Sequence, residues 1–236
     1  MRSILIAALA ATFMSGSAMA ADFALSETAV PAHAASSAFD WSGFYVGVTA
    51  GAGAGTIQDV ANPPAAAQDL SGATYGVTVG YNAQLDGGIV LGVEGDWSAA
   101  NIGKDWAGNE TNQFDPYYGS DRITSLATLR GRIGFAVDRF LPYLTAGLAF
   151  GSTEHTLGCD ADLVELTNGC GAQAVNGADD PGAPFETSNT GSSVGWTVGA
   201  GAEVAVTDNL SLKGEVLYGD LGQRTVELVD PFYPAA

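Results

Sequence analysis

Apolar and polar residues alternate along most of the chain. From Phe44 onward the even positions are apolar as far as Ala52, whereas the odd positions carry Tyr45, three glycines and Thr49. The same period of two returns in six further segments, at 73–84, 89–99, 122–137, 143–153, 192–206 and 209–220. A period of two places alternate side chains on opposite faces of a β-strand. The pattern therefore predicts seven strands, each with one apolar and one polar face.

The links between these segments are alternately short and long. Tight turns are expected at 85–88, 138–140 and 207–209, whereas the links at about 56–72, 100–121 and 154–191 are long and rich in Gly, Asn, Asp and Pro. Short turns at one end and long loops at the other are typical of an up-and-down meander. Tilted strands of about 10 residues are long enough to cross a bilayer. We therefore expect an all-β, transmembrane, antiparallel up-and-down β-barrel of eight strands, seven of them clear.

The first twenty residues follow another pattern. Arg2 precedes an apolar run from Ile4 to Met14, and the segment ends in Ala18-Met19-Ala20. This is the layout of a secretory signal peptide, and the run is too short for a spanning helix, which needs roughly 20 residues. We expect residues 1–20 to be a signal peptide, 21–40 a periplasmic spacer and 41–236 the barrel.

The polar face separates two kinds of exported barrel, a soluble one of lipocalin type and a membrane barrel. It consists of Gly, Thr and Ser with a few charges of both signs, whereas a soluble barrel would expose many Lys and Glu. Small residues with mixed charges suit a narrow interior in which buried ions must pair, although solvated strand residues are the alternative. We expect a lumenal polar network that consists of Glu94, Asp96, Arg130, Arg132, Glu203, Lys213 and Glu215.

Aromatic residues support the membrane interpretation. They lie on the apolar faces, and several are near strand ends, as in the aromatic girdles of membrane barrels; ordinary core packing is the alternative. The group comprises Phe44, Tyr75, Tyr81, Trp97, Phe135, Phe150, Trp196 and Tyr218.

Composition excludes several classes of function. Only 14% of the residues are charged, against roughly 25% in soluble domains, and 8 basic residues oppose 26 acidic ones. Nucleic-acid binding requires clustered Lys and Arg, which are lacking here. Loss of residues 1–20 removes Arg2 and no acid, so the net charge changes from −18 to −19.

Several segments resemble a known family. The run Phe39-Asp40-Trp41-Ser42-Gly43-Phe44-Tyr45-Val46-Gly47 resembles the opening of small OmpA/OmpX-like outer-membrane β-barrels, in particular the surface immunogens and porin-like proteins of Gram-negative bacteria. The segments 129–134, 142–149 and 209–222 are also similar to this group. The resemblance implies a structural, surface-exposed protein of the cell outer membrane that supports envelope integrity and surface interactions. A narrow porin-like channel or a surface haem binder is the alternative that the resemblance implies.

The same resemblance implies an eighth strand that ends in an aromatic residue. Here only about six residues before Pro231 could alternate, and proline cannot donate to a strand ladder. Either residues 223–233 form a short closing strand or the reading frame is truncated, and truncation is the favoured interpretation.

Candidate chemistry is scarce. His33 lies in the spacer and His155 at the start of the longest loop, where we expect solvated side chains; haem ligation by His155 is the alternative. We therefore expect no enzyme activity, no cofactor and no metal centre. Cys159 and Cys170 are expected to form a disulfide. An exported chain is in an oxidising compartment, and these two cysteines lie close together in the sequence.

The expected partners follow from the membrane location and from the acidic loop. They are outer-membrane lipids and lipopolysaccharide, divalent cations at the loop, and the barrel-assembly machinery during biogenesis. The loop at 154–190 holds seven acids and no Lys or Arg, although a solvated, self-repelling loop is the simpler interpretation.

Overall fold

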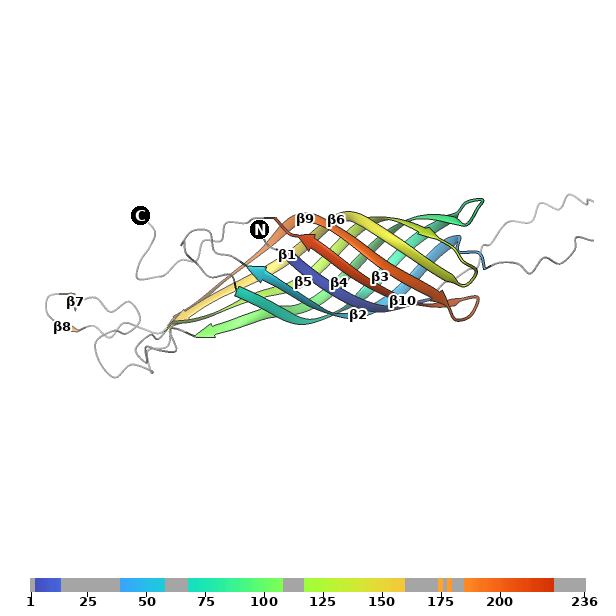
Figure 1. Ribbon diagram of the computed structural model, residues 1–236. Coiled ribbons are helices and arrows are strands. Elements are labelled where there is room, and N and C mark those ends of the chain that lie inside the picture. The colour runs from blue at the N-terminus through green and yellow to red at the C-terminus, as the bar shows by residue number, and fades with distance from the viewer. Residues whose placement is uncertain are drawn as a thin grey trace, which may run out of the picture.

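The protein forms a closed antiparallel β-barrel (Figure 1). The computed structural model describes residues 3–13, 39–57, 68–107, 117–159, 174–175, 178–179 and 185–222. The order around the barrel is β1-β10-β9-β6-β5-β4-β3-β2, so the predicted up-and-down fold is confirmed. The barrel strands are β1 (Ser3–Phe13), β2 (Gly43–Ile57), β3 (Gln68–Gln84), β4 (Ile89–Ala107), β5 (Tyr117–Phe135), β6 (Phe140–Cys159), β9 (Phe185–Ala205) and β10 (Leu210–Asp220).

Two very short strands lie outside the barrel. β7 (Ala174–Val175) pairs with β8 (Ala178–Asp179) in a separate two-stranded sheet. In the described part of the chain no helix is long and apolar enough to cross a membrane.

Tight turns join the strands at one end of the barrel, which we call the short-turn end; the opposite end is the loop end (Figure 1). The first turn contains Gly87 and Gly88, which both have a φ of 85°. Asp138 in the second turn has a φ of 53° and accepts a hydrogen bond from the backbone N–H of Phe39 at 3.5 Å. Glycine and aspartate tolerate this left-handed conformation, so the turn sequences suit tight hairpins.

The strands are longer at the loop end than the alternation predicts. Residues 100–107, 117–121, 154–159 and 185–191 were expected in loops, but they continue β4, β5, β6 and β9. The backbone ladder persists there while both faces become mostly polar, so the period of two disappears from the sequence. The predicted loop boundaries are therefore wrong on this side of the barrel.

The eighth place in the barrel is taken by β1, not by a segment near the C-terminus. β1 pairs antiparallel with β10, from Ser3 opposite Asp220 to Phe13 opposite Leu210, and on its other side with β2. An apolar run of about eleven residues is too short for a spanning helix but long enough for a spanning strand. The expectation for 223–233 lies outside the described residues, and the signal peptide stays a prediction.

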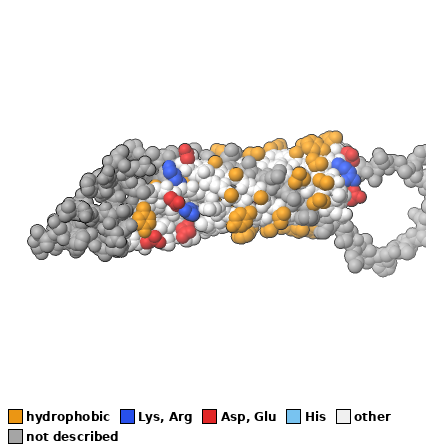
Figure 2. All heavy atoms as spheres, turned by 90° about the horizontal axis from the view of Figure 1, so that it is seen from below, with side chains coloured by type: hydrophobic (Ala, Val, Ile, Leu, Met, Phe, Trp, Pro, Cys, Tyr) orange, Lys and Arg blue, Asp and Glu red, His pale blue; other side chains and the backbone are white. Residues whose placement is uncertain are grey.

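The apolar faces of β2, β3, β4, β5, β6, β9 and β10 point outward. Phe44, Tyr75 and Val194 are 68%, 65% and 60% exposed, and the eight aromatic residues singled out in the sequence are all on this face. Figure 2 shows the apolar side chains gathered in the half of the wall nearer the short-turn end. A closed barrel with an apolar outer band matches a wall that faces lipid rather than water.

Candidate functional site

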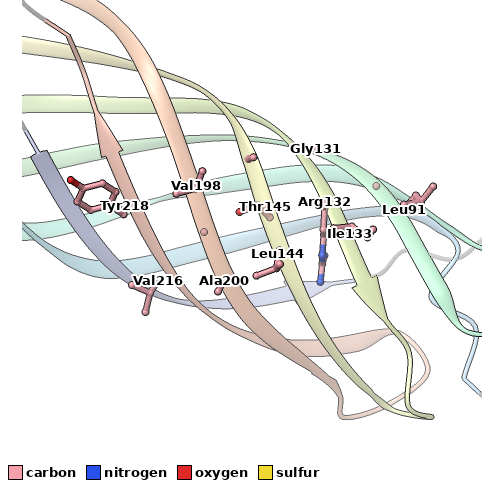
Figure 3. A pocket seen from close by; sticks show the side chains of 13 residues that line it. Leu91, Gly131, Arg132, Ile133, Leu144, Thr145, Val198, Ala200, Val216 and Tyr218 are labelled. Carbon is pink, nitrogen blue, oxygen red and sulfur yellow. The ribbon is translucent and has the colours of Figure 1, made fainter.

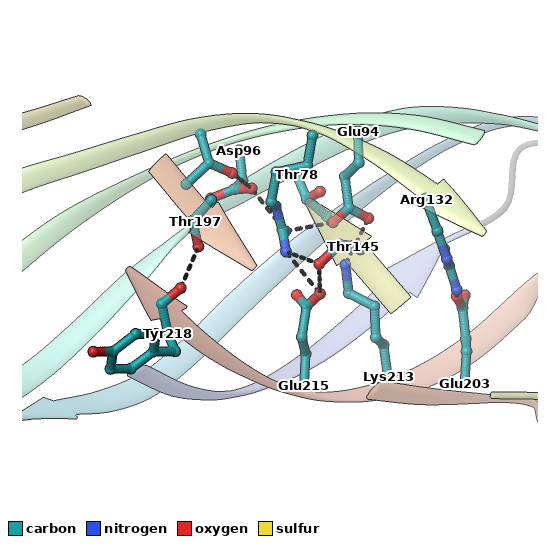
Figure 4. Close-up of polar contacts among 12 residues, drawn as sticks. Thr78, Glu94, Asp96, Arg132, Thr145, Thr197, Glu203, Lys213, Glu215 and Tyr218 are labelled. Atoms are coloured by element: carbon teal, nitrogen blue, oxygen red, sulfur yellow. Dashed lines mark hydrogen bonds and ion pairs between the residues drawn. The ribbon is translucent and has the colours of Figure 1, made fainter. Parts of the chain in front are cut away.

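A network of charged side chains lies inside the barrel (Figure 4). Arg130 on β5 reaches three carboxylates: Glu94 at 2.6 Å and Asp96 at 2.9 Å through Nη2, and Glu215 at 2.7 Å through Nη1. Lys213 on β10 donates to the second oxygen of Glu94 at 2.7 Å. The guanidinium plane presents several N–H donors in a fixed fork, which lets one arginine hold partners from different strands.

A second ion pair lies beside the first, closer to the short-turn end. Arg132 Nη2 is 2.5 Å from Glu203 on β9, and Ser211 donates to the other carboxylate oxygen of Glu203 at 2.5 Å. The guanidinium of Arg132 lies 3.8 Å from the centre of the Tyr143 ring and 5.9 Å from that of Tyr45. These contacts stabilise a buried cation by ion pairing and by cation–π attraction.

Tyr45 connects the two groups of charges. Its hydroxyl donates to Glu94 at 2.7 Å and lies 3.5 Å from Nη1 of Arg132. The seven residues that the sequence assigned to a lumenal network are thus brought together by the structure, and six of them are at most 6% exposed. Sequence reasoning left out Tyr45 and Tyr143, although Tyr45 stands on the polar phase of its strand, which is the signal that could have identified it.

Buried apolar clusters lie in the lumen on both sides of the charges. Toward the loop end lies a cluster of Leu70, Ile102, Ile123, Leu126, Ala149 and Leu221. Toward the short-turn end lies a second cluster of Trp41, Tyr45, Val90, Leu141 and Ala205. A cavity of about 40 Å³ remains beside the charged layer, lined in part by Thr74, Thr78 and Asp96. This space holds a few water molecules at most.

Trp41 packs at the short-turn end of the lumen. It is fully buried, its indole N–H donates to the backbone oxygen of Asp138 at 3.0 Å, and its backbone N–H donates to the side chain of Gln84 at 2.9 Å. Phe39 packs edge-on against Trp41 with ring centres 4.8 Å apart and also contacts Arg139. The residues just before β2 therefore tie two turns together and form the floor of the lumen.

His155 is not the solvated loop residue that the sequence predicted. It lies on β6, is 7% exposed, and pairs through Nδ1 with Asp121, which stands directly opposite on β5. The strand ladder continues past the predicted loop boundary and carries His155 to the inner face. Its Nε2 is buried and has no hydrogen-bond partner among the described residues. His33 lies outside the described residues.

Only one of the two cysteines of the expected disulfide lies within the described residues. Cys159 at the end of β6 is 1% exposed and disulfide-bonded. Cys170 lies outside the described residues, so its pairing with Cys159 stays a prediction. Within the described ranges no group of three or more His, Cys, Asp or Glu side chains could hold a metal ion.

The closed barrel, its outward apolar band and its charged interior define a small transmembrane β-barrel. The sequence matches the outer membrane protein beta-barrel domain over residues 6–230, and the chain belongs to this family.

Named relatives agree with this assignment. The 31 kDa outer-membrane immunogenic protein of Brucella melitensis is 34% identical over 242 residues, which cover 98% of this chain and 91% of the relative. The 25 kDa outer-membrane immunogenic protein of Brucella abortus is 28% identical, over 97% and 88%. The 22 kDa outer membrane protein of Rhizobium leguminosarum is 31% identical, over 80% and 68%. The protein is therefore an outer-membrane barrel of a Gram-negative bacterium, with its short turns periplasmic and its long loops extracellular.

Proposed function

We propose that the protein is a structural barrel of the outer membrane whose lumen passes no solute. The observation that carries this proposal is Arg130, which bridges three carboxylates from β4 and β10 across the lumen. The apolar clusters on either side of this layer add two further barriers. An ion entering the lumen would have to separate buried charge pairs, and removing one partner of such a pair costs about 3–5 kcal/mol.

The proposal extends to the role of the two ends of the barrel. The lipid-facing band anchors the protein in the envelope, and the polar loop end carries the surface interactions. Lipopolysaccharide is the proposed partner at that end, with divalent cations between its phosphates and the acidic loop at 154–190. Proteins of the assembly machinery are the proposed partners during insertion.

We also propose that the barrel is not an enzyme. Asp121 orients His155 as in a catalytic dyad, but Nε2 of His155 reaches no hydroxyl group among the described residues. Nε2 is also enclosed by the wall, which disfavours haem ligation. Haem titration followed by absorbance is expected to give the same result for wild type and His155→Ala; a Soret shift lost in the variant would favour the haem-binding alternative.

Conductance in a planar bilayer tests the main proposal. Wild-type protein, shown to be folded by a gel shift between unheated and boiled samples, is expected to give no single-channel steps. A porin reconstituted in parallel controls for insertion. Regular steps from the folded protein would replace the proposal with the narrow channel.

A further inference from the structure

The lipid-facing wall contains a hollow of about 850 Å³ (Figure 3). It extends across five neighbouring strands, β4, β5, β6, β9 and β10. Its floor is formed by Gly131, Ala146 and Ala200, while larger side chains such as Ile133 and Val198 line it. Gly131 and Ala146 are direct cross-strand partners. The volume lies within the range of about 300–1,000 Å³ that is typical of small-molecule pockets.

Gly131 is not required by packing within the barrel. A Cβ built at Gly131 would meet only the backbone oxygen of Ala146, at 3.9 Å. At the lumen-facing Gly80, in contrast, a Cβ would lie 2.3 Å from the ring of Tyr45, and at Gly147 it would lie 2.1 Å from a backbone oxygen. Glycine weakens a strand, and inside one it often marks the close approach of a ligand. The open space at Gly131 thus points to an occupant outside the barrel.

The position of the hollow in the wall indicates that its occupant is a hydrocarbon chain. Leu91 stands two positions from the start of β4 and Ile133 two positions from the end of β5, so the hollow begins near the periplasmic side. Four strand spacings of about 4.8 Å give it a width of about 19 Å around the barrel wall. One leaflet of a hydrocarbon core of about 30 Å is about 15 Å thick, which a single acyl chain spans.

A second copy of the barrel fits the hollow less well. A partner barrel is convex and would rest on the side chains at the rim, which include Leu144 and Tyr218. The floor at Gly131 and Ala146 would then stay empty, and the contacts that make dispersion attraction large would be missing. A flexible chain only one methylene wide can follow the floor instead.

We propose that this hollow is a binding site for an acyl chain of a phospholipid from the periplasmic leaflet. The lipid is held by apolar contact with the floor and rims, and it stays with the barrel longer than the lipids around the rest of the wall. Lipopolysaccharide, which would approach from the outer leaflet, does not occupy it.

Native mass spectrometry of barrel extracted from outer membranes in mild detergent tests this site. Wild type is expected to retain one phospholipid. Ala146→Leu fills the floor and is expected to lower the retained phospholipid about tenfold, as two displaced methylene contacts would. Gly131→Leu is expected to do the same. The matched control is Ala50→Leu, since Ala50 is also exposed and outward-facing but lies on β2, away from the hollow.

Each possible result decides the proposal. Folding of every variant is checked by the gel shift between unheated and boiled samples. Loss of phospholipid in Ala146→Leu and Gly131→Leu, with retention in Ala50→Leu, supports the site. Wild type without phospholipid, equal loss of phospholipid in all three variants, lipopolysaccharide that Ala146→Leu and Gly131→Leu displace in place of phospholipid, or a dimer that only Ala146→Leu dissociates would each overturn it.

Discussion

Lys213 and Glu94 meet at 2.7 Å in the lumen, although 119 residues separate them in the chain. Glu94 also holds Arg130 at 2.6 Å, so a single carboxylate pairs with two buried cations, one from β5 and one from β10. Such contacts form only when the barrel has closed in the correct register. The charged layer therefore specifies strand register, in addition to the blocking role proposed for it.

Glu94→Ala is expected to destabilise the barrel strongly. The substitution leaves Lys213 and Arg130 without their shared partner in a buried site, and breaking a buried pair in this way costs about 3–5 kcal/mol. Urea unfolding in lipid vesicles, followed by the heat-dependent gel shift, measures the change.

The exposed ion pair between Arg139 and Asp208 is the control for Glu94→Ala. Their atoms lie 2.6 Å apart, but the side chains are 46% and 81% exposed. Asp208→Ala is therefore expected to cost at most about 1 kcal/mol. Equal losses in the two variants would contradict a role for the buried layer in stability.

Leu129→Arg tests which face of the strands meets lipid. Leu129 is 58% exposed on the outward face of β5, six positions from the periplasmic end of that strand. An arginine near the bilayer midplane of a barrel costs about 2–4 kcal/mol. Val206 has the same exposure but lies in a short turn, so Val206→Arg is expected to change the free energy of unfolding little. A soluble barrel would tolerate both variants, which the same urea titration would reveal.

The lumenal charges could be predicted because one regular pattern places them. Arg130 and Arg132 are two positions apart on β5, so alternation alone puts both on the face opposite the apolar residues. Sequence shows the face but not the partner, because the three carboxylates of Arg130 depend on how β4 and β10 are staggered.

The pair of Asp121 and His155 could not be predicted in the same way. The register of β5 against β6 shifts between Ile123 and Ser125. Inward residues are even-numbered beyond this irregularity, as at Arg130, but odd-numbered before it, as at Asp121. An irregularity of this kind changes the phase of the pattern, and toward the loop end the outward face of the strands is polar, so no outward apolar alternation reveals the change.

Trp41→Ala is expected to loosen the periplasmic floor. The indole is fully buried, and removing a large aromatic side chain from a packed site costs about 3–5 kcal/mol. Trp41→Phe keeps most of the ring and loses only the hydrogen bond to Asp138, so about 0.5–1.5 kcal/mol is expected. Limited proteolysis from the periplasmic side, together with urea unfolding, measures both effects. A loss as large in Trp41→Phe as in Trp41→Ala would assign the role to the hydrogen bond rather than to packing.

Protein isolated from the outer membrane is expected to begin at Ala21, as the signal-peptide prediction requires. β1 lacks the alternation of the other seven barrel strands, since apolar residues occupy both of its phases. Cleavage would remove β1 and leave the edges of β2 and β10 to be paired by another segment, because open edges in lipid expose unsatisfied backbone groups. Intact mass measurement checks the cleavage, and a mass that includes residues 1–20 would contradict it.

A variant without residues 223–236 then tests which segment replaces β1 between β2 and β10. Loss of the heat-dependent gel shift would assign the replacement strand to residues 223–236, whereas an unchanged shift would exclude them.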